Sequence, residues 1–295
     1  MKLTLLGTGT PAPSLKRMSS GYLLEIGDDV IVIDHGPGAH HRYLELGRRA
    51  TEVTHCFLSH LHYDHFMDYP RLLMTRWDQS AGKLAPLQVY GPPPIARITQ
   101  QLIGADGIYG PDIEARTRHS ASLDIHAARG GELPRLPPEA VVHEFEDGDA
   151  LDINGWRVTV GSGWHAQPYL ECLAYRFDSD AGSICYSGDS GGVCPAIVTL
   201  AKGCDVLVHM NHYYSGSEPN EAYRRFCGNH IDTAHVAQQA GVGAVVLTHM
   251  TDQIDHPGLR EKIIAEMSEI FKGTIIWGED GMEVPIKGGA LGRID

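Results

Sequence analysis

Apolar residues occur along most of this chain in short blocks or in alternation with polar residues, a pattern that predicts β-strands. Glycine, proline and Asp-Asp turns separate these blocks. The predicted strands are Lys2–Leu6, Gly21–Ile26, Val30–Ile33, Val53–Leu58, Leu87–Tyr90, Val141–Phe145, Ala150–Ile153, Trp156–Val160, Glu171–Phe177, Ser183–Tyr186, Asp205–Val208, Ala244–Leu247, Thr274–Trp277 and Met282–Ile286.

Helical periodicity appears between the strands, and the two kinds of element interleave without repeats or linkers. This arrangement predicts one α/β domain spanning residues 1–295. The glycine-rich loop at Asp34–Gly38 either approaches a functional site or simply turns into the next helix. The predicted helices are one beginning at Ala39 and the segments Phe66–Trp77, Ile95–Ile103, Thr233–Ala240 and Gly258–Phe271.

Residues 104–138 interrupt this regular pattern. Glycine, proline, arginine, serine and histidine dominate the stretch, and no clean periodicity is visible. Long irregular segments in compact domains are usually functional or mobile. We interpret this stretch as an insertion over the active site; a surface or subunit-contact loop is the alternative.

The most informative polar stretch is Ser-His-Leu-His-Tyr-Asp-His at 59–65, directly after an apolar strand. His60 and His62 are two residues apart, so on an extended segment they project from the same side and can bind one ion. Asp64 and His65 follow where the chain turns into a helix, which directs them toward a second ion. Imidazole with carboxylate suits zinc, or manganese or iron. A histidine-rich surface loop is the alternative, but four ligand residues in seven favour a metal site.

Three further candidate ligands, His165, Asp189 and His249, each follow the C-terminal end of an apolar strand. Strand ends of a packed sheet converge on one edge, where sites form. Taken singly, each of the three could be an ordinary loop residue. Their shared position predicts that they join the 59–65 motif.

The motif resembles that of the metallo-β-lactamase superfamily, and further segments resemble its ribonuclease Z branch over nearly the whole chain. Residues about 95–140 are the least similar part. The resemblance implies a four-layer αββα sandwich with two divalent ions, most readily zinc. It assigns His60, His62 and His165 to the first ion, Asp64, His65 and His249 to the second, and Asp189 to both. The segments that carry the branch resemblance are Leu5–Pro11, Ser19–Gly21, Ile33–Gly38 and Val89–Pro93.

Two ions held roughly 3.5–4 Å apart can share a hydroxide that attacks at neutral pH. The chemistry implied is therefore hydrolysis, with no nucleophilic side chain and no organic cofactor. In the ribonuclease Z branch a histidine supported by a glutamate assists the leaving group. His230 matches that histidine and, with Asp64, is our catalytic candidate. Met210 takes the place of the glutamate, so either His230 works without that partner or another acid, such as Asp232, replaces it.

Composition indicates a cytoplasmic protein. The chain has 295 residues, 42% of them hydrophobic, and no apolar run of the roughly 18–20 residues that a membrane helix needs. Its N-terminus is interrupted by Gly7 and Gly9 and is predicted to be a first strand rather than a signal peptide. The six cysteines contain no Cys-x-x-Cys pair and are expected to be small buried hydrophobes.

The net charge of −13, from 24 basic and 37 acidic residues, argues against a large nucleic-acid footprint. The only basic concentration is Arg116, Arg118, Arg129 and Arg135. The 23 residues between His165 and Asp189 are too few for the arm that grips tRNA in the family. We therefore predict a small-molecule substrate and consider nucleic acid unlikely.

The predicted substrate is a small ester, lactone, sulfate or phosphodiester. Four aromatic residues beside the site segments are expected to line its pocket, although core packing could account for each one alone. The alternatives are a ribonuclease Z-like endonuclease that processes tRNA 3′ ends and a non-catalytic metal-binding scaffold; a complete ligand set argues against the scaffold. The resemblance also implies a homodimer. The four aromatic residues are Tyr63, Trp164, Tyr169 and Tyr213.

Overall fold

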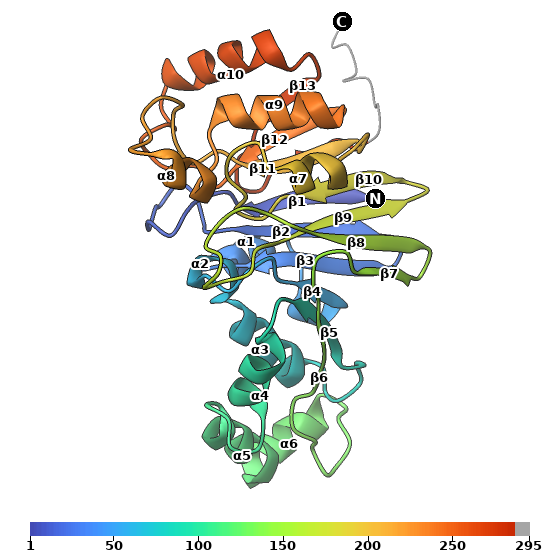
Figure 1. Cartoon of the computed structure of the whole chain (residues 1–295). Coiled ribbons are helices and arrows are strands. Elements are labelled where there is room, and N and C mark those ends of the chain that lie inside the picture. Colours follow the sequence, from blue (N-terminus) through green and yellow to red (C-terminus); the bar gives the residue numbers. More distant parts are fainter. Residues whose placement is uncertain (287–295) are drawn as a thin grey trace, which may run out of the picture.

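The apolar segments of the first half of the chain form one seven-stranded sheet together with a last strand near residue 284 (Figure 1). The computed structural model describes residues 1–286. In this sheet the order is β14-β1-β2-β3-β4-β5-β6. Strands β1 to β3 are antiparallel neighbours, whereas β3 to β6 run parallel. The strands are β1 (Lys2–Gly7), β2 (Gly21–Ile26), β3 (Asp29–His35), β4 (His55–Phe57), β5 (Leu87–Gly91), β6 (Ala140–Glu144) and β14 (Glu283–Val284).

The second half of the chain forms the other seven-stranded sheet, in the order β13-β12-β11-β10-β9-β8-β7. Here β7 to β10 are antiparallel and β10 to β13 are parallel. Each sheet therefore has an antiparallel half and a parallel half. Within the parallel half, the C-terminal ends of the strands lie at the same edge of the sheet. The strands are β7 (Ala150–Ile153), β8 (Trp156–Ser162), β9 (Leu173–Ser179), β10 (Gly182–Tyr186), β11 (Val206–Met210), β12 (Ala244–Thr248) and β13 (Thr274–Trp277).

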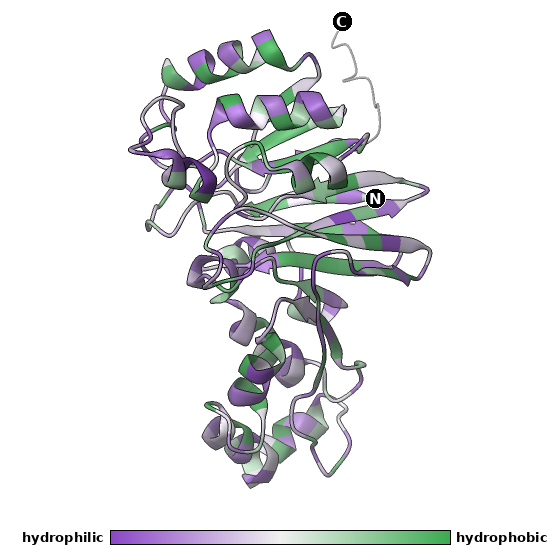
Figure 2. Ribbon diagram, viewed as in Figure 1, coloured by the Kyte–Doolittle hydropathy of each residue, from purple (hydrophilic) through white to green (hydrophobic). Residues whose placement is uncertain are grey.

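Successive side chains point to opposite sides of each sheet, and most strands are buried on both faces. The edge strands β6 and β7 are partly exposed. In β1, Leu5 packs between the two sheets and Leu6 packs under the helices of the first sheet. In β12, Val246 packs between the sheets and Val245 packs under the helices of the second. The hydrophobic colouring of the strands in Figure 2 follows this double burial.

Helices cover the outer face of each sheet, so the predicted four-layer αββα sandwich is confirmed. The first sheet carries α1 (Ala39–Glu45), the 3-10 turn η1 (Ala50–Glu52), α3 (Tyr69–Gln79) and α4 (Ile95–Ile103). The second carries α7 (Pro195–Leu200), α9 (His230–Ala240) and α10 (Leu259–Ile270). No helix within residues 1–286 is long and apolar enough to cross a membrane.

The single helix predicted at Phe66–Trp77 is two helices in the structure, α2 (Tyr63–Phe66) and α3. Pro70 lies in the first turn of α3, where its missing N–H costs nothing. Asp68 at the junction accepts hydrogen bonds from the backbone N–H groups of Gly38 and His40, at 2.9 and 3.1 Å. The break matters because α2 carries two of the predicted metal ligands.

The prediction of an irregular stretch at 104–138 is wrong, because it contains α5 (Gly110–Arg118) and α6 (Ser120–Ala128). Each helix buries only one side chain, Ile113 in α5 and His126 in α6, so neither has the apolar stripe that reveals a helix in sequence. Arg116, Arg129 and Arg135 instead hold the segment to Asp78 near the end of α3, at 2.8 to 3.2 Å.

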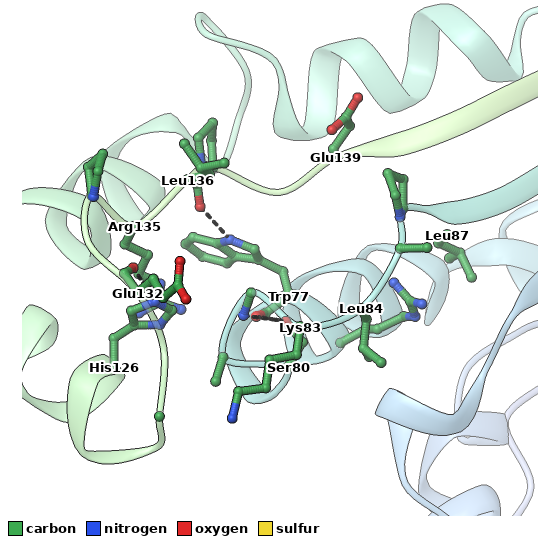
Figure 3. Close-up of a pocket in the computed structure, with 18 of the residues that line it drawn as sticks. Trp77, Ser80, Lys83, Leu84, Leu87, His126, Glu132, Arg135, Leu136 and Glu139 are labelled. Carbon is green, nitrogen blue, oxygen red and sulfur yellow. Dashed lines mark hydrogen bonds between the residues drawn. The ribbon is translucent and has the colours of Figure 1, made fainter.

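These contacts place the segment beside α3. A pocket of about 580 Å³ lies between α3, the loop before β5 and residues 130–139 (Figure 3). At its centre the Trp77 indole N–H donates to the Leu136 carbonyl, 2.9 Å away, and the Arg135 guanidinium lies over the Trp77 ring. The assignment of 1–295 as one domain stays a prediction, and residues 287–295 lie outside the described part of the chain.

Candidate metal centre

The predicted ligands converge where four strand ends and their loops meet. His60 and His62 follow β4, and the break before α3 directs Asp64 and His65 from α2 to the same place. The other three come from loops after β8, β10 and β12. The structure groups all seven predicted ligands into two clusters of neighbouring ligand atoms: His60, His62 and His165, and Asp64, His65, Asp189 and His249.

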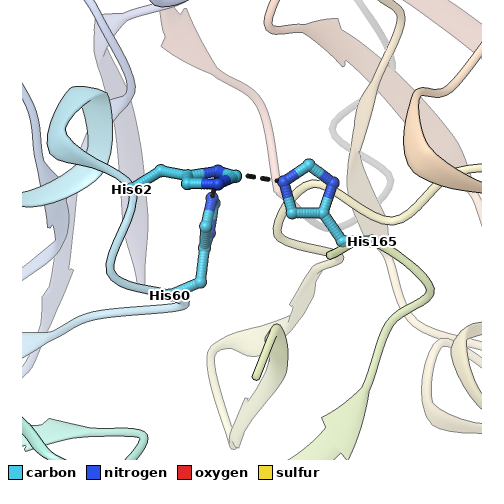
Figure 4. A group of neighbouring side chains, drawn as sticks. All are labelled: His60, His62 and His165. Atoms are coloured by element: carbon cyan, nitrogen blue, oxygen red, sulfur yellow. Dashed lines mark hydrogen bonds between the residues drawn. The ribbon is translucent and has the colours of Figure 1, made fainter. Parts of the chain in front are cut away.

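In the first cluster three imidazole nitrogens face one another (Figure 4). His62 Nδ1 lies 3.1 Å from His60 Nε2 and 3.0 Å from His165 Nε2. The His165 Nδ1–H donates to the Phe226 carbonyl at 2.7 Å, so its Nε2 presents a lone pair. The Ser59 hydroxyl donates to Asp34 and can therefore accept from His60 Nδ1–H, which leaves a lone pair on His60 Nε2 as well.

Two lone pairs directed at one point repel each other unless a cation lies between them. Burial lowers the pKa of His165 to about 4 and that of His60 well below its ordinary value, so both rings are neutral at pH 7. Neutral imidazole is the form that binds a metal. The donor set of the first cluster therefore fits a divalent ion.

In the second cluster two carboxylates and two imidazoles meet. His65 Nε2 lies 3.4 Å from Asp64 Oδ2 and 3.3 Å from Asp189 Oδ2. His249 Nε2 lies 3.2 and 3.1 Å from the same two oxygens. Asp189 Oδ2 is also 3.8 Å from His60 Nε2 and 4.0 Å from His165 Nε2, which places it between the clusters.

Asp34 fixes the orientation of His65. The Nδ1–H of His65 donates to Asp34 Oδ2 at 2.7 Å, and the hydroxyl of Tyr186 donates to the same oxygen at 2.6 Å. Asp34 also accepts from the backbone N–H of Ser59 at 2.7 Å. With Nδ1 protonated, His65 Nε2 faces the carboxylates and has no hydrogen-bond partner, and neither has Asp64 Oδ1. Metal-bound histidines ordinarily make this second contact with a carboxylate.

The second cluster attracts positive charge. Burial opposes protonation of His65, but Asp189 and Asp34 outweigh it and raise the pKa of His65 well above its ordinary value. Burial likewise opposes ionisation of Asp189, but its histidine neighbours lower its pKa well below the ordinary value. The carboxylates are therefore charged at neutral pH and stabilise a cation, either a proton on His65 or a metal ion. The unpartnered His65 Nε2, which faces both carboxylates, fits the metal ion better.

Sequence reasoning missed His212, which follows β11. Its Nδ1 lies 3.2 Å from His249 Nδ1, and the two rings are stacked with centroids 5.3 Å apart. The signal was available, because His212 follows a predicted strand just as the other ligands do. It also missed Asp34 as the partner of His65, since that contact joins residues 31 positions apart.

His230 does not touch the two clusters in this structure. It is fully buried at the start of α9, where its Nε2 lies 2.8 Å from Glu266 Oε2 in α10. Its Nδ1 lies 3.3 Å from the backbone N–H of Ser215. Asp232, the acid suggested as its partner, is instead bound by Arg224. The carboxylate that contacts His230 comes from α10, not from the position of Met210.

The four predicted pocket aromatics fall in different places. Tyr63 is half exposed beside His62, and Tyr169 is almost fully exposed. Trp164 packs into the core beneath the helices of the second sheet, with the Arg225 guanidinium 4.8 Å from its ring centroid. Tyr213 lines a separate pocket of about 520 Å³. The structure therefore does not gather these residues into one wall.

Comparison with known proteins identifies the family. A family model described as "Beta-lactamase superfamily domain" matches residues 30–250. The chain is 32% identical over 286 residues to "Ribonuclease Z" of Mycobacterium bovis (strain BCG / Pasteur 1173P2), covering 95% of this chain and 96% of that protein. It is 31% identical to "Ribonuclease Z" of Mycobacterium sp. (strain KMS), over 98% of this chain and 97% of that one.

Solved structures share the fold. The metallo-β-lactamase fold protein YhfI from Bacillus subtilis superposes with a TM-score of 0.72 at 19% identity, over 96% of this chain and 99% of that one. The short form of human tRNase Z superposes with a TM-score of 0.69 at 21% identity, over 97% and 99%.

These findings overturn the prediction of a small-molecule substrate with nucleic acid unlikely, because relatives that match along the whole chain are ribonucleases. Net charge was a poor guide, since it sums over the entire surface whereas a phosphodiester is bound locally. The missing arm was a poor guide too. The alignment to the Mycobacterium bovis protein already covers 96% of that protein, which leaves little room for an arm there.

The histidine and aspartate clusters on this fold suit the binding of divalent metal. The chain is a metal-dependent hydrolase acting on ester-type bonds, which excludes the non-catalytic scaffold. The chain belongs to the metallo-β-lactamase superfamily, as a ribonuclease Z-like member.

Proposed function

We propose that this protein is a ribonuclease Z-like endonuclease that hydrolyses a phosphodiester near the 3′ end of precursor tRNA. The observation that supports the proposal is the pair of adjoining ligand clusters with Asp189 between them, in a chain whose relatives over its full length are named ribonuclease Z. Phosphodiester hydrolysis suits such a site, because two cations can neutralise charge on both the attacking and the leaving oxygen.

We assign the two clusters to two divalent ions, most readily zinc, because imidazole and carboxylate ligands suit that metal. Bound ions would polarise the phosphodiester and lower the pKa of the attacking water. The chain holds the ligands still for this purpose. Asp34 orients His65, the Phe226 carbonyl orients His165, and Ser59 links His60 to Asp34.

Asp64 and His230 are the proposed proton-handling residues. Asp64 Oδ2 lies in the second cluster, while Asp64 Oδ1 has no hydrogen-bond partner and can accept a proton from the attacking water. His230 would donate a proton to the leaving oxygen, with Glu266 stabilising its charged form. Because both ring nitrogens of His230 have partners here, this role requires Ser215 N–H or Glu266 to yield its place when RNA binds.

The test is cleavage of a precursor tRNA carrying a 3′ trailer, with the metal-loaded full-length protein at physiological salt. We expect a single product cut at the 3′ end, lost in His62→Ala and retained in His41→Ala, an exposed histidine of α1. Hydrolysis of bis(p-nitrophenyl) phosphate reports on the metal centre in parallel. Turnover of that ester with no cleavage of any precursor tRNA would reject the assignment. The cytoplasmic location and the homodimer stay predictions.

A further inference from the structure

A pocket lined by tyrosines lies beside the proposed metal centre and has no role in the mechanism above. Its volume of about 520 Å³ is within the roughly 300–1,000 Å³ of small-molecule sites. The loops after β11 and β12 and the start of α10 form its walls. The lining residues that matter here are Tyr213, Tyr214, Tyr223, Thr251, Gln253 and Ile254.

Two strand-end loops connect the pocket walls to the metal centre. Tyr213 directly follows His212, whose ring stacks on the ligand His249. Thr251 lies two residues beyond His249, and its hydroxyl donates to the His212 carbonyl at 2.9 Å. A group in this pocket would therefore be a close neighbour of a substrate held at the second cluster.

The pocket has the character of a site for a flat aromatic ring. The ring centroids of Tyr213 and Tyr223 are 5.2 Å apart with planes tilted by 59°, so the two rings form an angled wall. Tyr213 is held rigidly, because its hydroxyl accepts from Asn229 Nδ2 at 3.0 Å. Tyr223, on α8 (Glu221–Phe226), is only partly buried. Rigid aromatic walls stack bases without regard to sequence.

A polar group and a cation accompany these rings. The exposed Gln253 side chain lines the pocket and makes no hydrogen bond within residues 1–286, so its amide can both donate to and accept from a base edge. The Lys262 ammonium lies 4.9 Å from the centroid of the Tyr214 ring, at the pocket's edge, where it can face a phosphate. Among the described residues, Glu266 is its only acidic neighbour in ion-pair range, at 3.8 Å.

We propose that this pocket binds one unpaired nucleobase of the RNA, that of a nucleotide next to the scissile phosphodiester, by stacking against Tyr223 and Tyr213. The inference rests on the proposed function, since it takes RNA as the substrate. It adds a specificity element that the two ligand clusters cannot supply, because they contact only the phosphodiester. Stacking of this kind favours a single-stranded end over a paired one, since a paired base is not free to enter.

The test uses RNA with a non-hydrolysable linkage at the cleavage position and 2-aminopurine on one side of it or the other. Stacking on tyrosine quenches the fluorescence of this base. We expect quenching at one of the two positions in the metal-loaded protein. Tyr223→Ala should abolish the quenching and raise Kd about ten-fold, whereas Tyr223→Phe, which keeps the ring, should preserve both.

A double-mutant cycle separates stacking from a loss of folding. An RNA with an abasic ribose at the quenched position should also bind about ten-fold more weakly to the native protein. The abasic RNA and the Tyr223→Ala protein should bind each other no more weakly than either binds its native partner, because both changes remove the same contact. Fully additive losses, or no quenching at either position, would overturn the proposal.

The outcome is independent of the cleavage assay. If the base is quenched and the double-mutant cycle shows coupling, but no precursor tRNA is cleaved, the nucleobase pocket is supported and the proposed tRNA processing is rejected. The opposite result is cleavage at the 3′ end while Tyr223→Ala and the abasic RNA bind as the native protein and RNA do. That result would support the proposed tRNA processing and reject the nucleobase pocket.

Discussion

His230 Nε2 lies 2.8 Å from Glu266 Oε2, so a fully buried imidazole at the start of α9 has a carboxylate partner from α10. Burial lowers the pKa of His230, and Glu266 acts in the opposite direction. Glu266 itself has a lowered pKa because the hydroxyl of Tyr214, and then His230, donate to it. The pair therefore keeps a buried histidine closer to the pKa that a proton donor needs.

The first prediction concerns this pair. Glu266→Gln removes the charge that favours the imidazolium, so the pKa of His230 falls further and the proton donor is lost at a lower pH. We expect the alkaline limb of the kcat profile for RNA to move to lower pH, because general acid catalysis requires protonated His230. Glu269→Gln, an exposed neighbour on α10, should leave the profile unchanged.

His230→Ala should slow RNA cleavage by roughly 10²–10⁴-fold while slowing bis(p-nitrophenyl) phosphate, whose leaving group needs no proton, far less. Equal slowing of both substrates at unchanged metal content would mean that His230 is structural.

The second prediction is the metal content. Elemental analysis of protein purified without chelator should find about two divalent ions per chain, one for each ligand cluster. His60→Ala should lower that content and abolish hydrolysis, because His60 Nε2 is a member of the first cluster and also lies 3.8 Å from Asp189. Active protein that reproducibly contains no metal would contradict the proposed site.

The third prediction concerns Asp34, which contacts His65 but no proposed ion. Asp34→Asn should weaken metal affinity by about 10–100-fold, as changes in the outer partners of metal ligands do. The measurement is competition with a chromogenic chelator. Asp29→Asn is the matched control, because Asp29 is also a buried carboxylate with hydrogen-bonded partners but lies away from the ligands. A loss of affinity equal to that of the control would show that Asp34 acts through general stability alone.

The fourth prediction concerns the dependence of stability on pH. Asp255 is buried with Arg17, whose Nε donates to it at 2.8 Å. Burial opposes ionisation of Asp255, but Arg17 and Lys16 outweigh it and lower its pKa below the ordinary value. A lowered carboxyl pKa stabilises the folded state above the unfolded pKa of about 3.9 and loses that stability as pH falls toward the folded pKa.

Asp255→Asn should therefore lower the free energy of unfolding at pH 7 by about 3 kcal/mol, because Arg17 is left buried without its counter-charge. The difference from the native protein should shrink as pH is lowered below about 4. Urea unfolding at pH 7 and pH 3 measures it, with the exposed Asp252→Asn as control. A difference that stays constant with pH would mean that the ion pair is not its cause.

The sequence by itself determined the strands of the sandwich and the residues of the proposed metal site. Every predicted strand is present, because burial on both faces gives most strands a continuous apolar block. The motif at 59–65 predicted four candidate ligands because they lie within seven consecutive residues. His165, Asp189 and His249 could be found because each follows a predicted strand. Helices α5 and α6 could not be found, since ion pairs to Asp78 rather than an apolar stripe hold them.

The tertiary structure alone decided which residues support that site. Glu266 reaches His230 across 36 positions and Asp34 reaches His65 across 31, and such contacts depend on how distant elements pack rather than on any local spacing. The tyrosine pocket likewise combines α8, α10 and two strand-end loops that no short segment contains. The candidate ligand residues can be recognised from the local sequence around each of them. Their orientation depends on how the two sheets and their helices pack around them.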